Sequence, residues 1–222
     1  MSFLQLDHLP HKALRHEIIH IAQRMNELGI NQGKSGNVSA RTDDGFLITP
    51  TGIPYEETKP EQIVAMNMDG THVGEVLPSS EWRFHRDIYA SGADNVNAIV
   101  HTHAPYATTL ACMDRGIPPF HYMVAAAGGS DIRCAAYATF GTQELSEHVL
   151  VALRDRNACL MSHHGMIARG GNLQLALALA VEVESLARMY WQALQIGEPV
   201  ALSESEMRVV LDKFQTYGQQ SL

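Results

Sequence analysis

Lysine is scarce in this sequence, and no run of basic residues occurs in it. Only four lysines are present among 222 residues, Lys12, Lys34, Lys59 and Lys213, and the formal net charge is −8. A nucleic-acid-binding protein normally presents a basic patch, so this charge balance argues against nucleic acid as a partner. None of the four lysines lies in an apolar strand, where burial would lower its pKa, and this disfavours catalysis through a lysine Schiff base.

Cysteine and long apolar runs are also scarce. The three cysteines, Cys112, Cys134 and Cys159, are widely spaced and odd in number, so they fit neither a disulfide framework nor a thiolate zinc site. We expect buried structural thiols and a reducing, cytoplasmic location. The first residues contain no apolar signal segment, and two glutamates interrupt the most apolar helix expected, at 173–187, so neither secretion nor a membrane span is predicted.

Two phosphate-binding motifs are absent as well. No GxGxxG follows a strand and no GxxxxGK[ST] occurs, which disfavours the dinucleotide-binding and P-loop classes. Segments of helical periodicity are instead mixed with short apolar strands and hairpins, without a repeat or a long polar linker. This order predicts an α/β domain of three layers, and we expect residues 1–222 to form a single domain.

Several elements have recognisable local signals. The periodicity predicts a helix at about 11–29, a helix capped by Ser79 or Ser80, a loop and strand at 117–129 and a strand or hairpin at 157–170. A last helix is expected after Ser203, because Glu206 follows at the spacing of a capping box.

The first candidate site is the motif "VHTH", which ends a predicted strand. Side chains two residues apart on a strand share a face about 6.6 Å apart at the backbone, so His101 and His103 could converge on one metal ion. Thr102 would then face the other layer. For this pair alone, the alternative that both histidines are solvated or hydrogen-bonded in the core is the more common one.

A second histidine pair and a carboxylate favour the metal interpretation. His163 and His164 follow another apolar run, and their rings should point to opposite faces, so that only one can join the site. Glu81 begins a predicted helix. Three histidines and one carboxylate suit Zn²⁺, with Mn²⁺ or Co²⁺ possible.

Three loops combine small hydroxyl or amide residues with glycine, proline or a helix start. They are "SGNVS" at 35–39, "TPTGIP" at 49–54 and "PSSEW" at 78–82. Such segments can present backbone N–H groups and hydroxyls to a phosphate without a lysine, although each can also be an ordinary capped turn.

Taken together, these segments resemble the class II aldolase/adducin family. The resemblance is carried in collinear order from about residue 14 to 218 by "GINQGKSGNVSAR", "FLITPTGIPYEE", "LPSSEWRFH", "IVHTHAPYATTLA", "IPPFHYMVAAAGGSDIRCAAYATFGTQELSEHV", "HHGMIARGGNLQLALALAVEVESLARMY" and "VVLDKFQTYG". It implies a three-layer α/β/α domain with a central, mainly antiparallel sheet, preceded by residues 1–10 as an N-terminal extension.

The resemblance also implies roles for individual residues. Zinc would be bound by His101, His103, His164 and Glu81, and Glu81 would also be the acid/base residue. The phosphate of the substrate would be held by Asn37, Thr51, Gly52, Ser79 and Ser80. The remaining catalytic residues would be two tyrosines, Tyr122 and Tyr217, which would reach the site of an adjacent subunit in a homotetramer.

The activity implied is zinc-dependent retro-aldol cleavage of a sugar phosphate, with L-fuculose 1-phosphate giving dihydroxyacetone phosphate and L-lactaldehyde. Three alternatives remain. Another ketose-phosphate aldolase could act on a 5-deoxy- or methylthio-pentulose 1-phosphate, and an L-ribulose-5-phosphate 4-epimerase would use the same bond cleavage. A non-enzymatic, adducin-like scaffold is disfavoured because every expected metal ligand is present.

Overall fold

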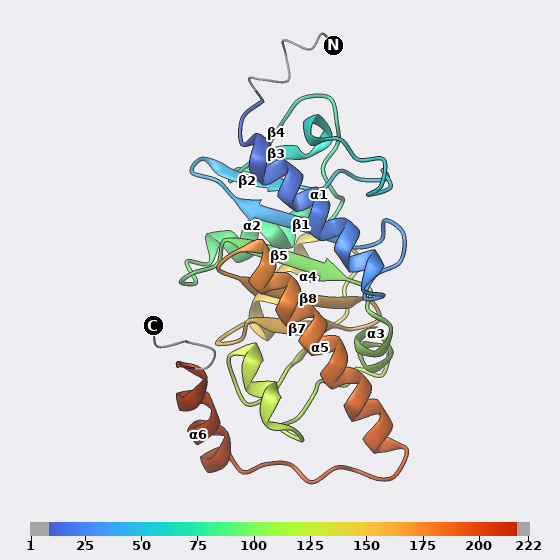
Figure 1. Ribbon diagram of the computed structural model, residues 1–222, viewed down its shortest axis with the longest axis vertical. Helices are drawn as coiled ribbons and strands as arrows, with labels where there is room; N and C mark the ends of the chain where they lie inside the picture. Colours follow the sequence, from blue (N-terminus) through green and yellow to red (C-terminus); the bar gives the residue numbers. More distant parts are fainter. Residues whose placement is uncertain (1–8, 217–222) are drawn as a thin grey trace.

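An eight-stranded sheet forms the centre of the computed structural model, which describes residues 9–216 (Figure 1). The strand order is β4-β3-β2-β1-β5-β8-β7-β6, and all neighbours are antiparallel except β6 and β7, which are parallel. The strands are β1 (Asn37–Arg41), β2 (Gly45–Ile48), β3 (Val64–Asn67), β4 (His72–Val73), β5 (Ala98–Thr102), β6 (Cys134–Ala135), β7 (Ala158–Met161) and β8 (Gly165–Gly170).

Helices cover both faces of this sheet. In Figure 1, α1 and α5 cross the near face, while α2 and α4 lie behind the strands. The helices are α1 (Lys12–Glu27), α2 (Trp82–Ala90), α3 (Pro105–Ala111), α4 (Gln143–Ala152), α5 (Leu173–Leu194) and α6 (Glu204–Phe214), with short 3₁₀ helices η2 (Pro60–Gln62) and η3 (Tyr122–Ala127). The expected three-layer α/β/α fold with a mainly antiparallel sheet is therefore confirmed.

The central strand β5 shows why this sequence requires two helical layers. All five of its residues are buried. Val100 packs in the core cluster under α1, α3 and α5, whereas Ile99 packs in the cluster under α2 and α4. A strand that buries apolar side chains on both faces must be covered on both faces, since apolar area removed from water stabilises the fold by about 25 cal/mol per Å².

Several local predictions are confirmed. The hairpin at 157–170 forms from β7 and β8, and the Ser203 hydroxyl accepts a hydrogen bond from the backbone N–H of Glu206 at the start of α6. Among the helices formed by residues 9–216, none has the length and apolar character that crossing a membrane would need.

Three local predictions are wrong. The residue before α2 is Glu81, and neither Ser79 nor Ser80 is the N-cap. Segment 117–129 contains the 3₁₀ helix η3 where a strand was expected, and its first N–H groups are satisfied partly by the His121 ring. Cys112 is exposed, so the expectation of three buried thiols holds fully only for Cys159.

Candidate metal centre and substrate hollow

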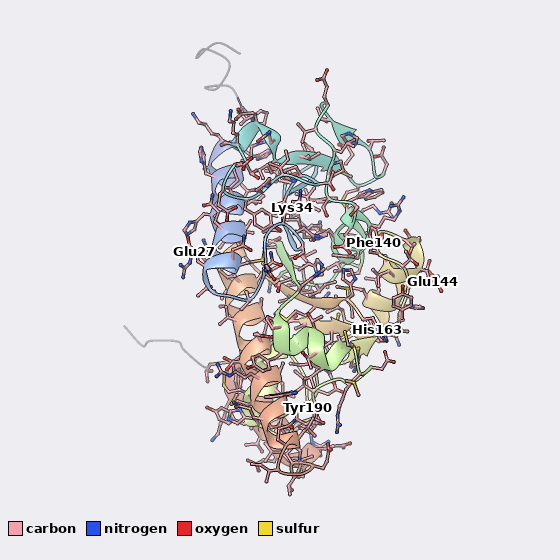
Figure 2. All side chains as sticks on the ribbon, turned by 90° about the vertical axis from the view of Figure 1, so that its right-hand side faces the viewer. Glu27, Lys34, Phe140, Glu144, His163 and Tyr190 are labelled. Atoms are coloured by element: carbon pink, nitrogen blue, oxygen red, sulfur yellow. The ribbon has the colours of Figure 1, made fainter. Side chains whose placement is uncertain are left out.

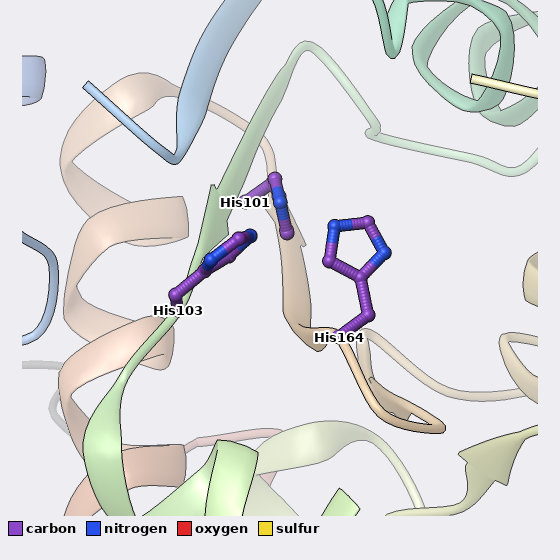
Figure 3. A group of neighbouring side chains, drawn as sticks. All are labelled: His101, His103 and His164. Carbon is purple, nitrogen blue, oxygen red and sulfur yellow. The ribbon is translucent and has the colours of Figure 1, made fainter. Parts of the chain in front are cut away.

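Three histidine side chains converge at the end of β5 (Figure 3). One ligand atom from each of His101, His103 and His164 lies within 4.8 Å of the others. The ring centroids form a nearly equilateral triangle, with separations of 5.0, 4.9 and 5.0 Å. The structure thus brings together all three histidines that the sequence selected.

His101 is held by the sheet itself. It is the fourth residue of β5 and is fully buried. Its Nδ1 atom lies 2.9 Å from the backbone carbonyl oxygen of Met166 on β8. A carbonyl only accepts, so Nδ1 carries the proton and Nε2 is left with a lone pair that can bind a metal.

His103 lies just beyond β5, where the chain turns into α3. Pro105 is the first residue of that helix, and the carboxylate of Glu184 on α5 accepts hydrogen bonds from the N–H groups of Tyr106 and Ala107 at 2.9 and 2.8 Å. These contacts fix the segment that carries His103. Burial, and then the charges of His101 and His164, lower the pKa of His103 to about 4, so its ring is neutral at pH 7.

His164 comes from the turn between β7 and β8. Its neighbour His163 has a left-handed backbone, with φ of 53°, and its ring packs edge-on against Tyr137 at a centroid distance of 6.0 Å. The prediction that only one of these two histidines joins the cluster is confirmed, but the turn separates them rather than the two faces of a strand.

Gly165 allows the turn to approach the other two histidines. A Cβ atom at this position would lie 2.5 Å from the carbonyl oxygen of Thr102, 3.1 Å from the His103 ring and 3.3 Å from the His101 ring. Any side chain at residue 165 would therefore displace the strand or the rings.

Glu81 lies against two of the imidazoles. Its Oε2 atom is 3.1 Å from His101 Nε2, and its Oε1 atom is 3.0 Å from His164 Nε2. Burial alone would raise the pKa of Glu81, but the charges of and contacts with His101 and His164 outweigh burial and hold that pKa well below its ordinary range. Glu81 is therefore a carboxylate at neutral pH.

The donor set fits a divalent metal ion. Glu81 Oε1, His101 Nε2 and His103 Nε2 are all buried and make no hydrogen bond of regular geometry. Buried polar atoms normally find partners, and three such atoms around one point mark a place where a cation can satisfy them. Three imidazoles with a nearby carboxylate suit zinc and leave coordination positions for a substrate.

The cluster opens into a hollow of about 350 Å³, which is lined by Ser35, Ser80, Glu81, His103, Tyr137, Ala138, Phe140, His163 and His164. Figure 2 shows the molecule from the side on which this hollow lies, with Phe140 and His163 labelled. The wall formed by Tyr137, Ala138 and Phe140 is largely apolar, and Phe140 is 66% exposed.

The residues expected to bind phosphate divide into two groups. Thr51, Ser79 and Ser80 line a second hollow, of about 490 Å³, that shares Ser80 and Phe140 with the first. Gly52 lies beside it, with φ of 74°. Asn37 lies elsewhere: its buried side-chain amide donates to Glu81 Oε2 at 3.0 Å.

Of the two expected catalytic tyrosines, the structure describes Tyr122, and it does not lie at this cluster. Tyr122, on η3, lines a separate hollow with Phe120 and residues of α6, and no residue described between 9 and 216 lines both that hollow and the histidine hollow. Tyr217 lies outside the described residues.

Sequence reasoning missed His85 and the apolar wall. His85 follows Glu81 by four residues, the spacing of one helical face, and this signal could have revealed it. Ala138 and Phe140 lie in a loop without periodicity, so only the folded chain brings them to the histidines.

The fold and the site together define a class: a three-layer α/β protein with three convergent histidines that could hold a metal ion at the end of a central strand. A family model described as "Class II Aldolase and Adducin N-terminal domain" matches residues 16–191. The chain therefore belongs to the class II aldolase/adducin family, and it is an aldolase, a carbon–carbon lyase.

Individual relatives are similar over nearly the whole chain. A 5-methylthioribulose-1-phosphate/5-deoxyribulose-1-phosphate aldolase from Rhodospirillum rubrum is 56% identical over 206 residues, which cover 93% of each chain. An L-fuculose phosphate aldolase from Escherichia coli is 54% identical, covering 92% of this chain and 95% of the relative. A solved L-fuculose 1-phosphate aldolase superposes with a TM-score of 0.89 at 39% identity, covering 94% of this chain and 99% of its own.

Proposed function

We propose that this chain cleaves a ketose 1-phosphate between C3 and C4, giving dihydroxyacetone phosphate and an aldehyde. The observation that carries the proposal is the convergence of His101, His103 and His164 on one point beside the buried carboxylate of Glu81. The three histidines hold the metal ion, and Glu81 completes the set in the absence of substrate. We assign zinc, with Mn²⁺ or Co²⁺ as substitutes.

When bound, the ion supplies Lewis-acid stabilisation for the negative charge that develops on the C2 oxygen as the C3–C4 bond breaks. In condensation the Glu81 carboxylate would remove a proton from C3, and in cleavage it would first take up a proton from solvent and then deliver it to C3. The proton on the C4 hydroxyl would pass to solvent through a second hydroxyl group, for which we propose Tyr122 of an adjacent copy. Cleavage then transfers one proton from O4 to C3 overall, and the bonding electron pair moves towards C2.

The phosphate would bind in the hollow lined by Thr51, Ser79 and Ser80, beside Gly52. Its connection with the histidine hollow at Ser80 supports this assignment, because a ketose 1-phosphate has its phosphate one carbon from the carbonyl. Asn37 also stays a proposed phosphate ligand, although it does not line this hollow and its buried amide donates to Glu81 Oε2 at 3.0 Å.

The position of Tyr122 supports an assembly. Tyr122 lines a different hollow from the histidines of its own chain, which supports a role at the site of another copy. We propose a homotetramer in which Tyr122 and Tyr217 complete the neighbouring site. The three free thiols support a reducing location such as the cytoplasm.

We assign L-fuculose 1-phosphate as the substrate, with L-lactaldehyde as the second product. A second candidate, a 5-deoxy- or 5-methylthio-pentulose 1-phosphate, is favoured by the name of the Rhodospirillum rubrum relative. Both candidates end in an apolar methyl group, which the wall of Tyr137, Ala138 and Phe140 would accommodate.

The test is release of dihydroxyacetone phosphate from L-fuculose 1-phosphate and 5-deoxy-D-ribulose 1-phosphate, with a chelator and then with zinc restored. L-Rhamnulose 1-phosphate and L-ribulose 5-phosphate serve as comparisons. Chelator-sensitive release from L-fuculose 1-phosphate or from 5-deoxy-D-ribulose 1-phosphate supports the proposal and identifies the substrate. Conversion of L-ribulose 5-phosphate without release of dihydroxyacetone phosphate would instead indicate an epimerase.

A further inference from the structure

A chain of hydrogen-bonded side chains runs into the protein from Glu81. Asn37 Nδ2 donates to Glu81 Oε2 at 3.0 Å, and Asn37 Oδ1 contacts His85 Nε2. On the other side of the same ring, His85 Nδ1 lies 2.7 Å from Ser39 Oγ, which lies 2.8 Å from the Tyr89 hydroxyl. The chain alternates between residues of β1 and residues of α2.

These side chains are sealed from water. His85 and Ser39 are fully buried, and Asn37 and Tyr89 are each 2% exposed. Burial, and then the charge of His101, lower the pKa of His85 to about 3, although the charge of Glu81 opposes this shift. His85 is therefore neutral at pH 7 and has one ring N–H and one acceptor nitrogen.

Only one arrangement of protons satisfies every member of the chain. If His85 carries its proton on Nε2, it donates to Asn37 Oδ1, so the amide N–H₂ of Asn37 faces Glu81. Nδ1 then accepts from Ser39, and Ser39 accepts from Tyr89. With the proton on Nδ1 the Asn37 amide must reverse, and its oxygen would face a carboxylate oxygen with no proton between them. The Glu81 carboxylate thus selects the Nε2–H form.

We propose that His85 is a positioning residue, which acts through Asn37 to hold the Glu81 carboxylate in the orientation needed for proton transfer at C3. The proposal rests on the acid/base role of Glu81 proposed above. The hydrogen-bond partners of the His85 ring are Asn37 and Ser39, and His85 does not line the hollow. It fixes the Asn37 amide as a donor, and that donor fixes Glu81 Oε2, while Oε1 lies 3.0 Å from His164 Nε2.

Two substitutions of His85 separate this role from simple core packing. The amide nitrogen of glutamine reaches the position of Nε2, so His85→Gln keeps a donor for Asn37. The shorter His85→Asn reaches only the position of Nδ1, so it keeps the contact with Ser39 and loses the donor. Ile88→Val, on the same helix and fully buried, is the control for loss of packing.

At saturating zinc, we expect His85→Asn to lower kcat about 10- to 100-fold while KM changes about twofold or less. A loss of this size is typical when a residue that orients a metal ligand through a hydrogen bond is replaced. His85→Gln should recover kcat to within about threefold of the wild-type value, and Ile88→Val should lower only the melting temperature. Equal losses of kcat in His85→Asn and Ile88→Val would overturn the proposal, as would equal losses in His85→Asn and His85→Gln.

A second measurement does not depend on turnover. In the metal-free wild-type protein, ¹H–¹⁵N correlation spectra of the histidine rings should show His85 as the Nε2–H tautomer up to at least pH 8. An Nδ1–H tautomer would overturn the positioning role even if the enzyme is active. A protein that cleaves none of the ketose phosphates but has the Nε2–H tautomer would refute the proposed function and leave the orientation of Asn37 intact.

Discussion

His101 donates its Nδ1 proton to the carbonyl oxygen of Met166 at 2.9 Å, across the ladder between β5 and β8. The same backbone pairing that builds the sheet therefore sets which ring nitrogen of His101 can bind a metal. The orientation of the His101 ring therefore depends on the pairing of β5 with β8, and no further side chain is needed to set it.

Metal removal should be visible in stability as well as activity. Because only the folded chain brings the three histidines together, an ion at a hundredfold excess over its Kd should add about 2.7 kcal/mol to the free energy of unfolding. For a chain of this size that corresponds to roughly 5–10 °C in melting temperature. Thermal unfolding with zinc and with a chelator measures this difference in melting temperature. An identical melting temperature in both samples would contradict metal binding by the three histidines.

Neighbouring histidines in one turn should differ in metal binding. His164→Ala should lose most of the bound metal, because it removes one of three convergent ligands. His163→Asn should retain the metal, since this ring faces Tyr137 and asparagine tolerates the left-handed backbone at this residue. Metal content per chain, measured after gel filtration, distinguishes them. Equal content in the two variants would show that His164 is not a ligand.

Glu81→Gln should separate metal binding from proton transfer. The three histidines remain, so the variant should still bind the ion, while kcat should fall by about 10²–10⁴ through loss of acid–base catalysis. Metal content and the rate of dihydroxyacetone phosphate release are measured on the same sample. A variant with near wild-type kcat would remove Glu81 from the proton-transfer step.

Two inactive variants should complement each other if Tyr122 acts on a neighbouring copy. Tyr122→Phe lacks the proposed proton acceptor, and His103→Ala lacks a metal ligand. Random exchange of subunits between equal amounts should leave about a quarter of the sites with both groups intact. Activity of the mixture is compared with each variant alone. No recovery after proven exchange would place Tyr122 outside the reaction.

Ser80 should affect substrate binding through the phosphate. Loss of one hydrogen bond to a charged group costs about 1.5–3 kcal/mol, so Ser80→Ala should raise KM for the ketose 1-phosphate roughly 10- to 100-fold. The slow reaction of the unphosphorylated ketose is the control and should not change. An equal loss with both substrates would indicate general damage to the hollow.

Acid should destabilise the metal-free protein partly through His85. The unfolded chain protonates this residue near pH 6.5, whereas the folded chain does so only near pH 3. Between these values the unfolded state binds more protons, so the free energy of unfolding falls as pH falls. His85→Gln should make this fall shallower in urea titrations at pH 7, 5 and 4. If the free energy of unfolding fell equally with pH in the variant and the wild type, the lowered pKa of His85 would be contradicted.

The sequence predicted the parts of the site that follow a local rule. His101 and His103 could be paired because alternation along a strand would place them on one face. The structure confirms that they converge, although β5 ends at Thr102 and His103 lies just beyond it. His164 could be separated from His163, although the cause is a turn with φ of 53° that no periodicity predicts.

Other features depend on contacts between distant segments. The family resemblance implies that Asn37 binds phosphate, and this stays a prediction. No local rule indicates that its amide contacts Glu81 and His85, which are 44 and 48 residues away. Segment 117–129 has strand-like apolar residues, but Val124, Ala125 and Ala127 are buried as one short 3₁₀ helix. In this segment tertiary packing overrides local preference.

The close approach at Gly165 divides the site into a part that can be varied and a part that cannot. A library aimed at a new aldehyde range should randomise Ala138 and Phe140, whose side chains border the hollow without supporting a histidine. Substitutions at Gly165 should give inactive variants, because any side chain at this residue would contact the His101 and His103 rings. Directed evolution of this protein can therefore change the wall at Ala138 and Phe140, whereas Gly165 has to remain glycine.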